Sequence, residues 1–260
     1  MKGIHKILAI AITAASSALA WGETREEVAQ RARSLLVDPN NYAVGTLSTV
    51  YPTTYSDESL RGAVASGPEY FGSCFENGDL LMLAMPVSQN WRNTLFTKTK
   101  NATISISSSA DPDVPDPRHT SIKSASKWDP SRPSWRRGMP SKQRITLFGH
   151  FERLIDKEEI EKVAPCYKNI HPDAKHWTPG SKDSPHVAFW TRFIVDKIYR
   201  VGGFGDESNI GWIDLDLWHK SVPDKHHTNI DTFSHSNEGS LSIETLFGES
   251  VDESPFYVQY

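Results

Sequence analysis

The longest regular pattern of hydrophobic and polar positions in this chain lies at residues 186–201, where the two kinds alternate. One parity is almost entirely apolar and consists of Val187, Phe189, Thr191, Phe193, Val195, Tyr199 and Val201. The other parity mixes Trp190, Ile194 and Ile198 with Arg192, Asp196 and Arg200. Since successive side chains of a strand point to opposite faces, we predict one long strand with a buried face and a mixed face.

A glycine-rich segment follows this strand and predicts a turn. Gly202, Gly203 and Gly205 supply backbone conformations that other residues resist. A second short strand is expected at 210–217. The two strands together predict a hairpin at one wall of a sheet or barrel.

Alternation also predicts strands at 101–107 and 144–155, and the content of Val and Thr predicts one at 42–50. The run 80–85 is apolar at both parities, which is typical of a strand buried on both faces. Asn77-Gly78 just before it is a strong hairpin signal, so 70–75 is expected to be its partner strand. Residues 51–68 contain two prolines and several serines and threonines, and they are expected to form an irregular loop.

Apolar residues at helical spacing predict helices at 23–36, 88–96 and about 157–164. Ser88 and Asp156 are the expected N-caps of the second and third helices, and Pro165 is expected to end the third. Many strands with few helices indicate a mainly β protein. We therefore predict a closed or nearly closed antiparallel barrel with flanking helices.

The first twenty residues have the pattern of a secretory signal peptide. Lys2 and Lys6 precede an apolar run at 7–15, and Ala18-Leu19-Ala20 offers a small-x-small cleavage site. The apolar run is shorter than the roughly 18–20 residues that a membrane span needs, and no later segment reaches that length. We predict a cleaved signal at 1–20, no membrane span, and a protein that is secreted or delivered to the lumen of a vacuole or lysosome.

A secretory route changes how the cysteines and one short motif are interpreted. The oxidising compartment allows one disulfide between Cys74 and Cys166, but the sequence leaves open whether their Cβ atoms meet. Asn101-Ala102-Thr103 is the chain's N-glycosylation sequon, and Asn101 falls on the polar parity of the strand at 101–107. We therefore predict a glycan on Asn101.

Two segments interrupt or follow the predicted barrel domain at 21–221. Residues 111–142 are rich in Pro, Ser, Arg and Asp and are too long for a plain connection, so they are expected to be an insertion loop. Residues 222–260 are polar, with several His and Ser, and are expected to be a C-terminal tail.

Charge and motifs exclude several classes of function. The net charge of −4 and the pI near 6.2 argue against a nucleic-acid-binding protein. Gly202-Gly203-Phe204-Gly205 lacks the spacing of a dinucleotide fingerprint, and a strand rather than a helix follows it. Several histidines near the tail have no partner at ligand spacing, so we predict no metal site; they are His219, His226, His227 and His235.

Four segments, in their order and spacing, carry a resemblance to a known family. They are Ser88 with Arg92-Asn93 and then 102–105, the strand 145–151 with Gly149, His171-Pro172-Asp173 with Trp177, and the hairpin at 202–212. Over roughly 23–221 the chain resembles the pyridoxamine phosphate oxidase-like, FMN-binding split-barrel superfamily. Within that superfamily it is similar to the CREG glycoproteins and to the related haem-utilisation proteins.

The resemblance implies a homodimer of antiparallel split barrels. In flavin-binding relatives FMN lies between the subunits, and Arg, Lys, Ser and Thr hold its phosphate. The matching loop at 51–56 has no Arg or Lys, a departure from that pattern. The basic residues nearest the matching groove are Arg92, Lys98 and Lys100, which we predict as the cofactor-binding set.

Two hypotheses about function follow. CREG glycoproteins are regarded as non-enzymatic, so the first is a secreted or vacuolar glycoprotein dimer that binds a partner or ligand, with no catalytic residues and no cofactor. The alternative is a flavin- or haem-dependent oxidoreductase with its ligand in the inter-subunit groove; FMN is the first candidate and haem the second.

Overall fold

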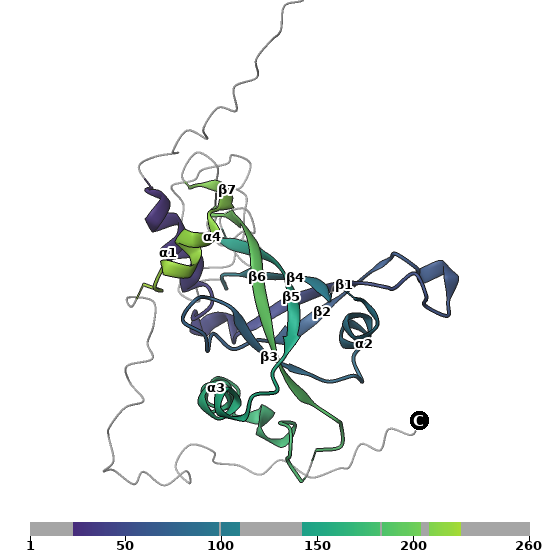
Figure 1. Ribbon diagram of the computed structural model, residues 1–260. Helices are drawn as coiled ribbons and strands as arrows, with labels where there is room; N and C mark the ends of the chain where they lie inside the picture. Colours follow the sequence, from purple (N-terminus) through teal and green to yellow (C-terminus); the bar gives the residue numbers. More distant parts are fainter. Residues whose placement is uncertain (1–22, 99, 110–141, 183, 204–207, 225–260) are drawn as a thin grey trace, which may run out of the picture. The chain divides into compact units, whose positions relative to one another are not determined.

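The computed structural model describes residues 23–98, 100–109, 142–182, 184–203 and 208–224 (Figure 1). Within these residues seven strands form one antiparallel sheet in the order β2-β1-β4-β5-β6-β3, and β7 pairs with β6. The strands are β1 (Val44–Val50), β2 (Val64–Tyr70), β3 (Leu80–Ala84), β4 (Asn101–Ser107), β5 (Arg144–Arg153), β6 (Phe189–Val201) and β7 (Ile210–Ile213).

The two ends of this strand order meet through one backbone bridge. Gly72, just after β2, pairs with Leu81 of β3, and each N–H donates to the other's carbonyl at 2.7 and 2.8 Å. The sheet therefore curls back on itself, which removes exposed edges. The prediction of a mainly β, antiparallel barrel with flanking helices is confirmed.

Two hydrophobic clusters fill the domain, and β3 separates them. Leu80, Met82 and Ala84 belong to the cluster enclosed by the sheet, whereas Leu81 and Leu83 pack into a second cluster with residues of α3. All five residues of β3 are buried. The prediction that this strand is buried on both faces is confirmed.

A β-bulge changes the face that β6 buries. Phe148 of β5 lies opposite Lys197, but Gly149 lies opposite Val195, so Asp196 is the extra residue. Before the bulge the buried residues at odd positions are Thr191, Phe193 and Val195, whereas after it the buried residues are Ile198 and Arg200, at even positions. The predicted alternation over 186–201 is therefore wrong beyond 195, because a bulge shifts the parity. Gly149 permits the close approach, since a Cβ there would lie 1.9 Å from the Ile194 carbonyl oxygen.

The segment predicted as a loop at 51–68 contains a strand. β2 pairs with β1 along its whole length, from Val44 opposite Tyr70 to Val50 opposite Val64. Pro68 is tolerated because β2 is at the end of the strand order, where a missing N–H costs no ladder bond. The predicted hairpin of 70–75 with 80–85 is also wrong: apart from the Gly72 bridge, β3 pairs with β6.

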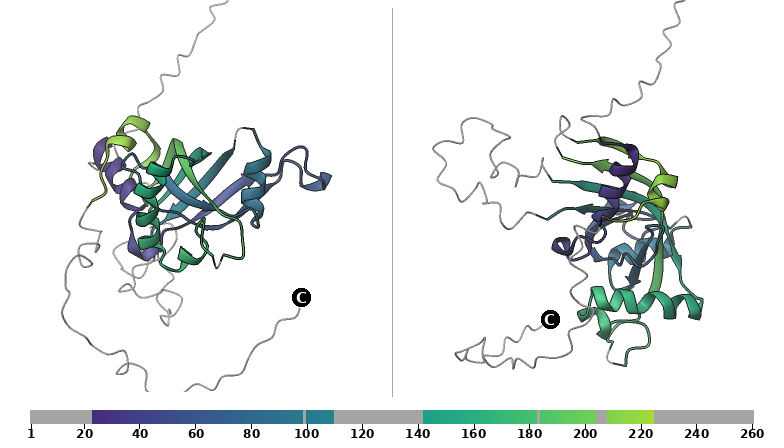
Figure 2. Two further views of the ribbon diagram at one scale, coloured as in Figure 1. Left: turned by 60° about the horizontal axis from the view of Figure 1, so that its bottom comes forward. Right: turned by 90° about the vertical axis from the view of Figure 1, so that its left-hand side faces the viewer.

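Four α-helices flank the sheet in the described residues: α1 (Arg25–Ser34), α2 (Gln89–Phe96), α3 (Lys157–Ile170) and α4 (Leu215–Lys220). α1 and α4 lie side by side near β7, and α3 lies at the far end of the sheet from them (Figure 1, Figure 2). Short 3-10 turns occupy Pro39–Asn41, Glu58–Leu60 and Asp173–His176.

Two predicted element ends are wrong. α3 continues through Pro165 to Ile170, because its buried face, including Tyr167, packs against the second cluster and offsets the bond that proline cannot make. The predicted strand at 210–217 ends at Ile213. Asp214 then caps α4, its carboxylate accepting from the N–H groups of Asp216 and Leu217.

Several predictions fall wholly or mostly outside the described residues. These are the signal peptide at 1–20, the insertion loop at 111–142 and the tail at 222–260. Among the residues that are described, no helix has the length and apolarity to cross a membrane.

Candidate functional site

A cavity of about 300 Å³ lies at the end of the domain where β1, β2 and β3 approach α3. Three aromatic side chains line it: Tyr70, Tyr167 and Trp177. Its other lining residues are Val44, Pro68, Glu69, Leu83, Met85 and Ala174. None of these nine residues carries a positive charge. The cavity is therefore aromatic and aliphatic, with one carboxyl group.

Glu69 supplies that carboxyl group from β2. The Ser88 hydroxyl donates to its Oε1 at 3.1 Å. Ser88 is the N-cap residue of α2, as predicted, but its side chain makes no capping hydrogen bond to the helix. Burial raises the pKa of Glu69, against the opposing hydrogen bond from Ser88. The indole N–H of Trp91 also favours the charged form, although it lies outside hydrogen-bond geometry.

The His-Pro segment after α3 fixes the wall that Tyr70 provides. The His171 ring stacks on Tyr70 with centroids 4.1 Å apart, and its Nε2 lies 2.9 Å from the Phe71 carbonyl oxygen. Because a carbonyl only accepts, Nε2 carries the hydrogen. Burial lowers the pKa of His171, so the neutral imidazole is favoured. The Tyr70 hydroxyl donates to Asp173 at 3.0 Å.

Tyr167 of α3 forms the opposite wall. Its ring lies edge-on to Trp190, with centroids 5.2 Å apart, and burial raises its pKa far above the usual range, helped by the charges of Glu69 and Asp173. Its neighbour Cys166 is joined to Cys74 by a disulfide that spans 92 residues. The bond ties α3 to the segment after β2, and the sequence had left this pairing open.

The predicted cofactor-binding residues lie elsewhere. Arg92 is exposed on α2 and donates to the Gln89 side chain at 2.8 Å. Lys98 and Lys100 are exposed between α2 and β4. None of the three lines the cavity. Their role in holding FMN stays a prediction.

Asn101, the predicted glycosylation site, is exposed at the start of β4. Its register partner on β5 is His150, which is 2.9 Å from Asp196. The side chain of Asn101 is therefore accessible from solvent. The glycan itself stays a prediction.

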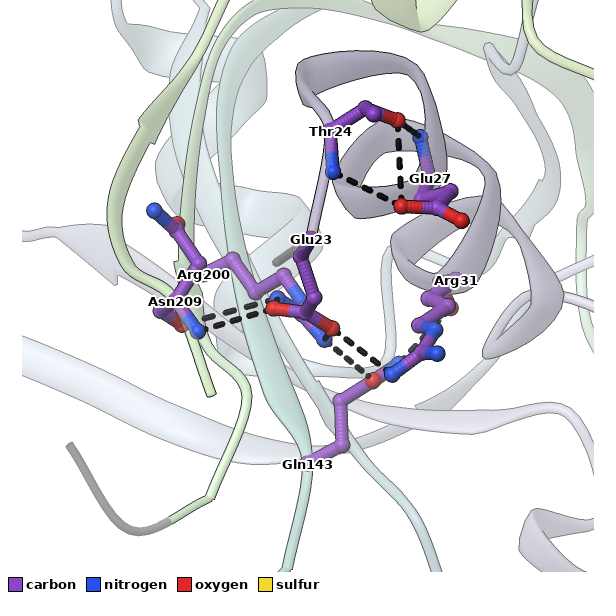
Figure 3. Close-up of polar contacts among 7 residues, drawn as sticks. All are labelled: Glu23, Thr24, Glu27, Arg31, Gln143, Arg200 and Asn209. Carbon is purple, nitrogen blue, oxygen red and sulfur yellow. Dashed lines mark hydrogen bonds and ion pairs between the residues drawn. The ribbon is translucent and has the colours of Figure 1, made fainter. Parts of the chain in front are cut away.

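A second polar group of residues is buried near β7 and is shown in Figure 3. The Arg200 guanidinium, only 1% exposed, donates to both oxygens of Glu23 at 3.2 and 3.3 Å. The N–H of Asn209 and the side chain of Arg31 donate to the same carboxylate at 2.9 and 2.7 Å. Burial opposes the charge of Glu23, but these hydrogen bonds outweigh it and lower its pKa. This network joins the residues before α1 to the β6–β7 hairpin.

Sequence reasoning missed both the cavity and this network. Glu69 lies between the predicted loop at 51–68 and the predicted strand at 70–75, and Arg200 was assigned to a mixed face. The sequence did contain a signal for the buried ion pair of Arg200. A charged residue between Ile198 and Gly202, inside a long predicted strand, indicates that its charge is paired with another buried group. No signal marked Glu69, because its neighbours in the cavity come from distant parts of the chain.

The pKa of Glu69 predicts how stability changes with pH. The folded state raises this pKa above its usual value of 4.5, so the fold favours the protonated carboxyl group of Glu69. The contribution of Glu69 to stability is therefore fully present below about pH 4.5 and is lost as the pH rises through the pKa of the folded state. Glu69→Gln should therefore raise the melting temperature at pH 7 and leave it unchanged at pH 4. Thermal unfolding across this range, with exposed Glu152→Gln as the control, measures the difference. Equal shifts at both pH values would contradict it.

The family of this chain follows from a match over nearly all of the described residues. Residues 23–220 match the family model described as CREG, β-barrel. The chain belongs to the CREG β-barrel family. The same family was expected from the sequence, and the match covers the sheet, all four helices and the cavity. No match was found among curated protein sequences.

Solved structures similar to this CREG-family chain have low sequence identity to it. A haem-binding protein from Mycobacterium smegmatis has a TM-score of 0.53 at 18% identity, covering 78% of this chain and 63% of that one. The chain thus spans less than two thirds of that structure's length. ChuZ of Campylobacter jejuni has a TM-score of 0.49 at 12% identity, covering 75% and 65%. A FAD-binding protein from Mesorhizobium loti has a TM-score of 0.36 at 10% identity, covering 62% and 84%.

Proposed function

We propose that this CREG-family split barrel acts by binding a compact ligand in the cavity beside Glu69, without catalysing a reaction on it. The cavity carries the proposal. Its volume of about 300 Å³ is at the lower end of the range for ligand sites, roughly 300–1,000 Å³. Such sites are mostly apolar, with a few polar groups that orient the ligand. Glu69, Tyr70 and Tyr167 are those groups here.

The polar groups around the cavity support recognition better than catalysis. A general acid or base needs a pKa near the working pH and a path for its proton. The phenol of Tyr167 is held protonated, and the Nε2–H of His171 is used by the Phe71 carbonyl. The Tyr70 hydroxyl is used by Asp173. These groups hold the wall of the cavity in place.

The same proposal includes a secretory route, a glycan and a homodimer. The signal-like pattern at 1–20, the exposed Asn101 and the Cys74–Cys166 disulfide support the first two. The proposal of a homodimer rests on the resemblance to the split-barrel superfamily. Exposed rings on the outer face give apolar surface for such a contact: Trp212 is 63% exposed and packs with Phe148 and Tyr199.

Expression of the full-length chain in a secretory eukaryotic host tests this part. We expect a protein in the medium or in the vacuolar lumen whose mass falls on treatment with an N-glycosidase. Thr103→Ala should abolish that mass change, whereas Thr103→Ser, which keeps the sequon, should preserve it. Light scattering should give twice the mass of one chain. A cytosolic, unglycosylated monomer would overturn these three expectations.

The alternative function is a haem- or flavin-dependent oxidoreductase. One observation favours it: the similar structure with a TM-score of 0.53 is described as a haem-binding protein. The cavity does not fit either group, since the FMN phosphate and the haem propionates are anionic and the cavity offers a carboxyl and no Arg or Lys. The exposed residues Arg92, Lys98 and Lys100 are the remaining candidates.

An absorption spectrum of the natively purified protein, followed by titration with FMN and haem, separates the two functions. We expect a colourless protein that binds neither group stoichiometrically. Flavin bands or a Soret band would favour the oxidoreductase. In that case, joint replacement of Arg92, Lys98 and Lys100 by alanine decides whether they hold the group, and Lys142→Ala serves as a basic surface control.

A further inference from the structure

The carboxyl group of Glu69 has an unusual setting, because it lies half-buried in the cavity wall without a positive partner. No Lys, Arg or His side chain forms an ion pair with it in the described part of the chain, and no cation contributes to its pKa. Burial raises that pKa, so the charged form is disfavoured in the free protein. A cationic ligand would give this half-buried carboxylate the positive partner that it lacks.

The negatively charged residues near the cavity come from more than one part of the fold. Glu69 comes from β2, and Asp173 follows α3 and accepts a hydrogen bond from Tyr70. The charges of both raise the pKa of Tyr167. A ligand with a negative group would meet these charges with no compensating cation among the lining residues.

The aromatic walls suit the same kind of ligand. The Tyr70 ring lines the cavity and is held in place by stacking on His171. Tyr167 and Trp177 supply two further rings from α3 and from the segment after it. A cation within about 6 Å of a ring centroid is attracted by the π-electrons, and most strongly when the site excludes water.

We infer that this cavity binds a compact organic cation, an amine or quaternary ammonium on a small apolar or aromatic body, with its charged nitrogen between the Glu69 carboxylate and the three rings. The inference rests on the proposed ligand-binding function and names the chemical class of the ligand. Ser88 fixes the carboxylate by its hydrogen bond, and Val44, Leu83 and Met85 contact the apolar body.

Calorimetric titration of the mature, disulfide-bonded protein with four probes of similar size tests this inference. The probes are benzylamine, benzyltrimethylammonium, benzyl alcohol and benzoate. We expect both cations to bind about tenfold or more tightly than benzyl alcohol, as one charge-assisted contact provides, and benzoate not to bind. Glu69→Gln should weaken binding of the cations by about tenfold and leave benzyl alcohol unchanged.

Two controls place the binding in the cavity. Glu152→Gln removes an exposed carboxylate of β5 and should change nothing. Val44→Trp fills the cavity and should abolish binding of every probe, while circular dichroism confirms that the variant is folded.

The outcomes separate this inference from the function on which it rests. If benzyl alcohol or benzoate binds as well as the cations, or if Glu69→Gln has no effect on them, the ligand is not a cation, although the cavity remains a binding site. If no probe binds at millimolar concentration, the inference is overturned. The FMN and haem titrations then decide between the two functions.

Discussion

Removal of the disulfide between Cys74 and Cys166 is expected to lower the free energy of unfolding by about 3–5 kcal/mol. The bond closes a loop of 92 residues, and the loss of chain entropy in the unfolded state grows with loop length. For a domain of this size about 1 kcal/mol corresponds to roughly 2–4 °C, so the melting temperature should fall by about 6–20 °C.

Urea unfolding of the double variant Cys74→Ser, Cys166→Ser measures this loss. Reduction of the native protein should give the same value, and the reductant should have no effect on the double variant. A loss below about 1 kcal/mol would show that the segment after β2 and α3 stay together without the bond. Because Cys166 precedes Tyr167, the variant should also weaken ligand binding in the cavity.

The substitution Glu23→Gln is expected to have the second large effect, lowering the free energy of unfolding by about 3–5 kcal/mol. The substitution keeps the shape of the side chain but leaves the Arg200 guanidinium, 1% exposed, without its counter-charge. Removing one partner of a buried ion pair has a cost of this size, since the other charge stays desolvated. The guanidinium would keep only neutral partners, the Gln143 side-chain oxygen at 2.9 Å and the Asn209 carbonyl oxygen at 3.5 Å, and its buried Nε has no partner among the described residues.

Chemical denaturation of Arg31→Gln provides the matched control. Arg31 donates to the same Glu23 carboxylate, but its side chain is 57% exposed, so its loss should cost less than about 1 kcal/mol. Equal losses for the two variants would show that burial of Arg200 does not determine the effect.

The pKa of Glu23 gives this pair its dependence on pH. The folded state lowers that pKa, so the stabilisation is present above the usual value of 4.5 and is lost as the pH falls through the folded value. Glu69 has the opposite dependence. The difference between native protein and Glu23→Gln should therefore shrink in acid, which unfolding curves at pH 3.5 and pH 7 measure.

The ion-pair network and the contacts beside the cavity stabilise opposite ends of the domain. The network joins the residues before α1 to the β6–β7 hairpin, whereas the disulfide and the Tyr70–His171 stack hold α3 and its following turn against β2 and β3. A ligand in the cavity would link β1, β2, β3 and α3. Its binding is expected to stabilise the fold by mass action.

The sequence by itself determined the fold class and the family. Period-two alternation identified β4, β5 and the first part of β6, since each has one buried face. The content of Val and Thr identified β1, and apolar residues at both parities identified β3. The start of α3 followed from its capping residue, Asp156. These signals are local, so neighbouring residues are enough to show them.

Only the tertiary structure decided the rest, because it depends on residues that are far apart in the chain. β2 contains Gly67 and Pro68, which break the strand pattern, and it exists because β1 pairs with all of it. The bulge at Asp196 follows from the approach of Gly149 to β6, which no local pattern records. Glu69 and Tyr167 are 98 positions apart in the sequence (167 − 69) and line one cavity only because β2 and α3 meet in the fold.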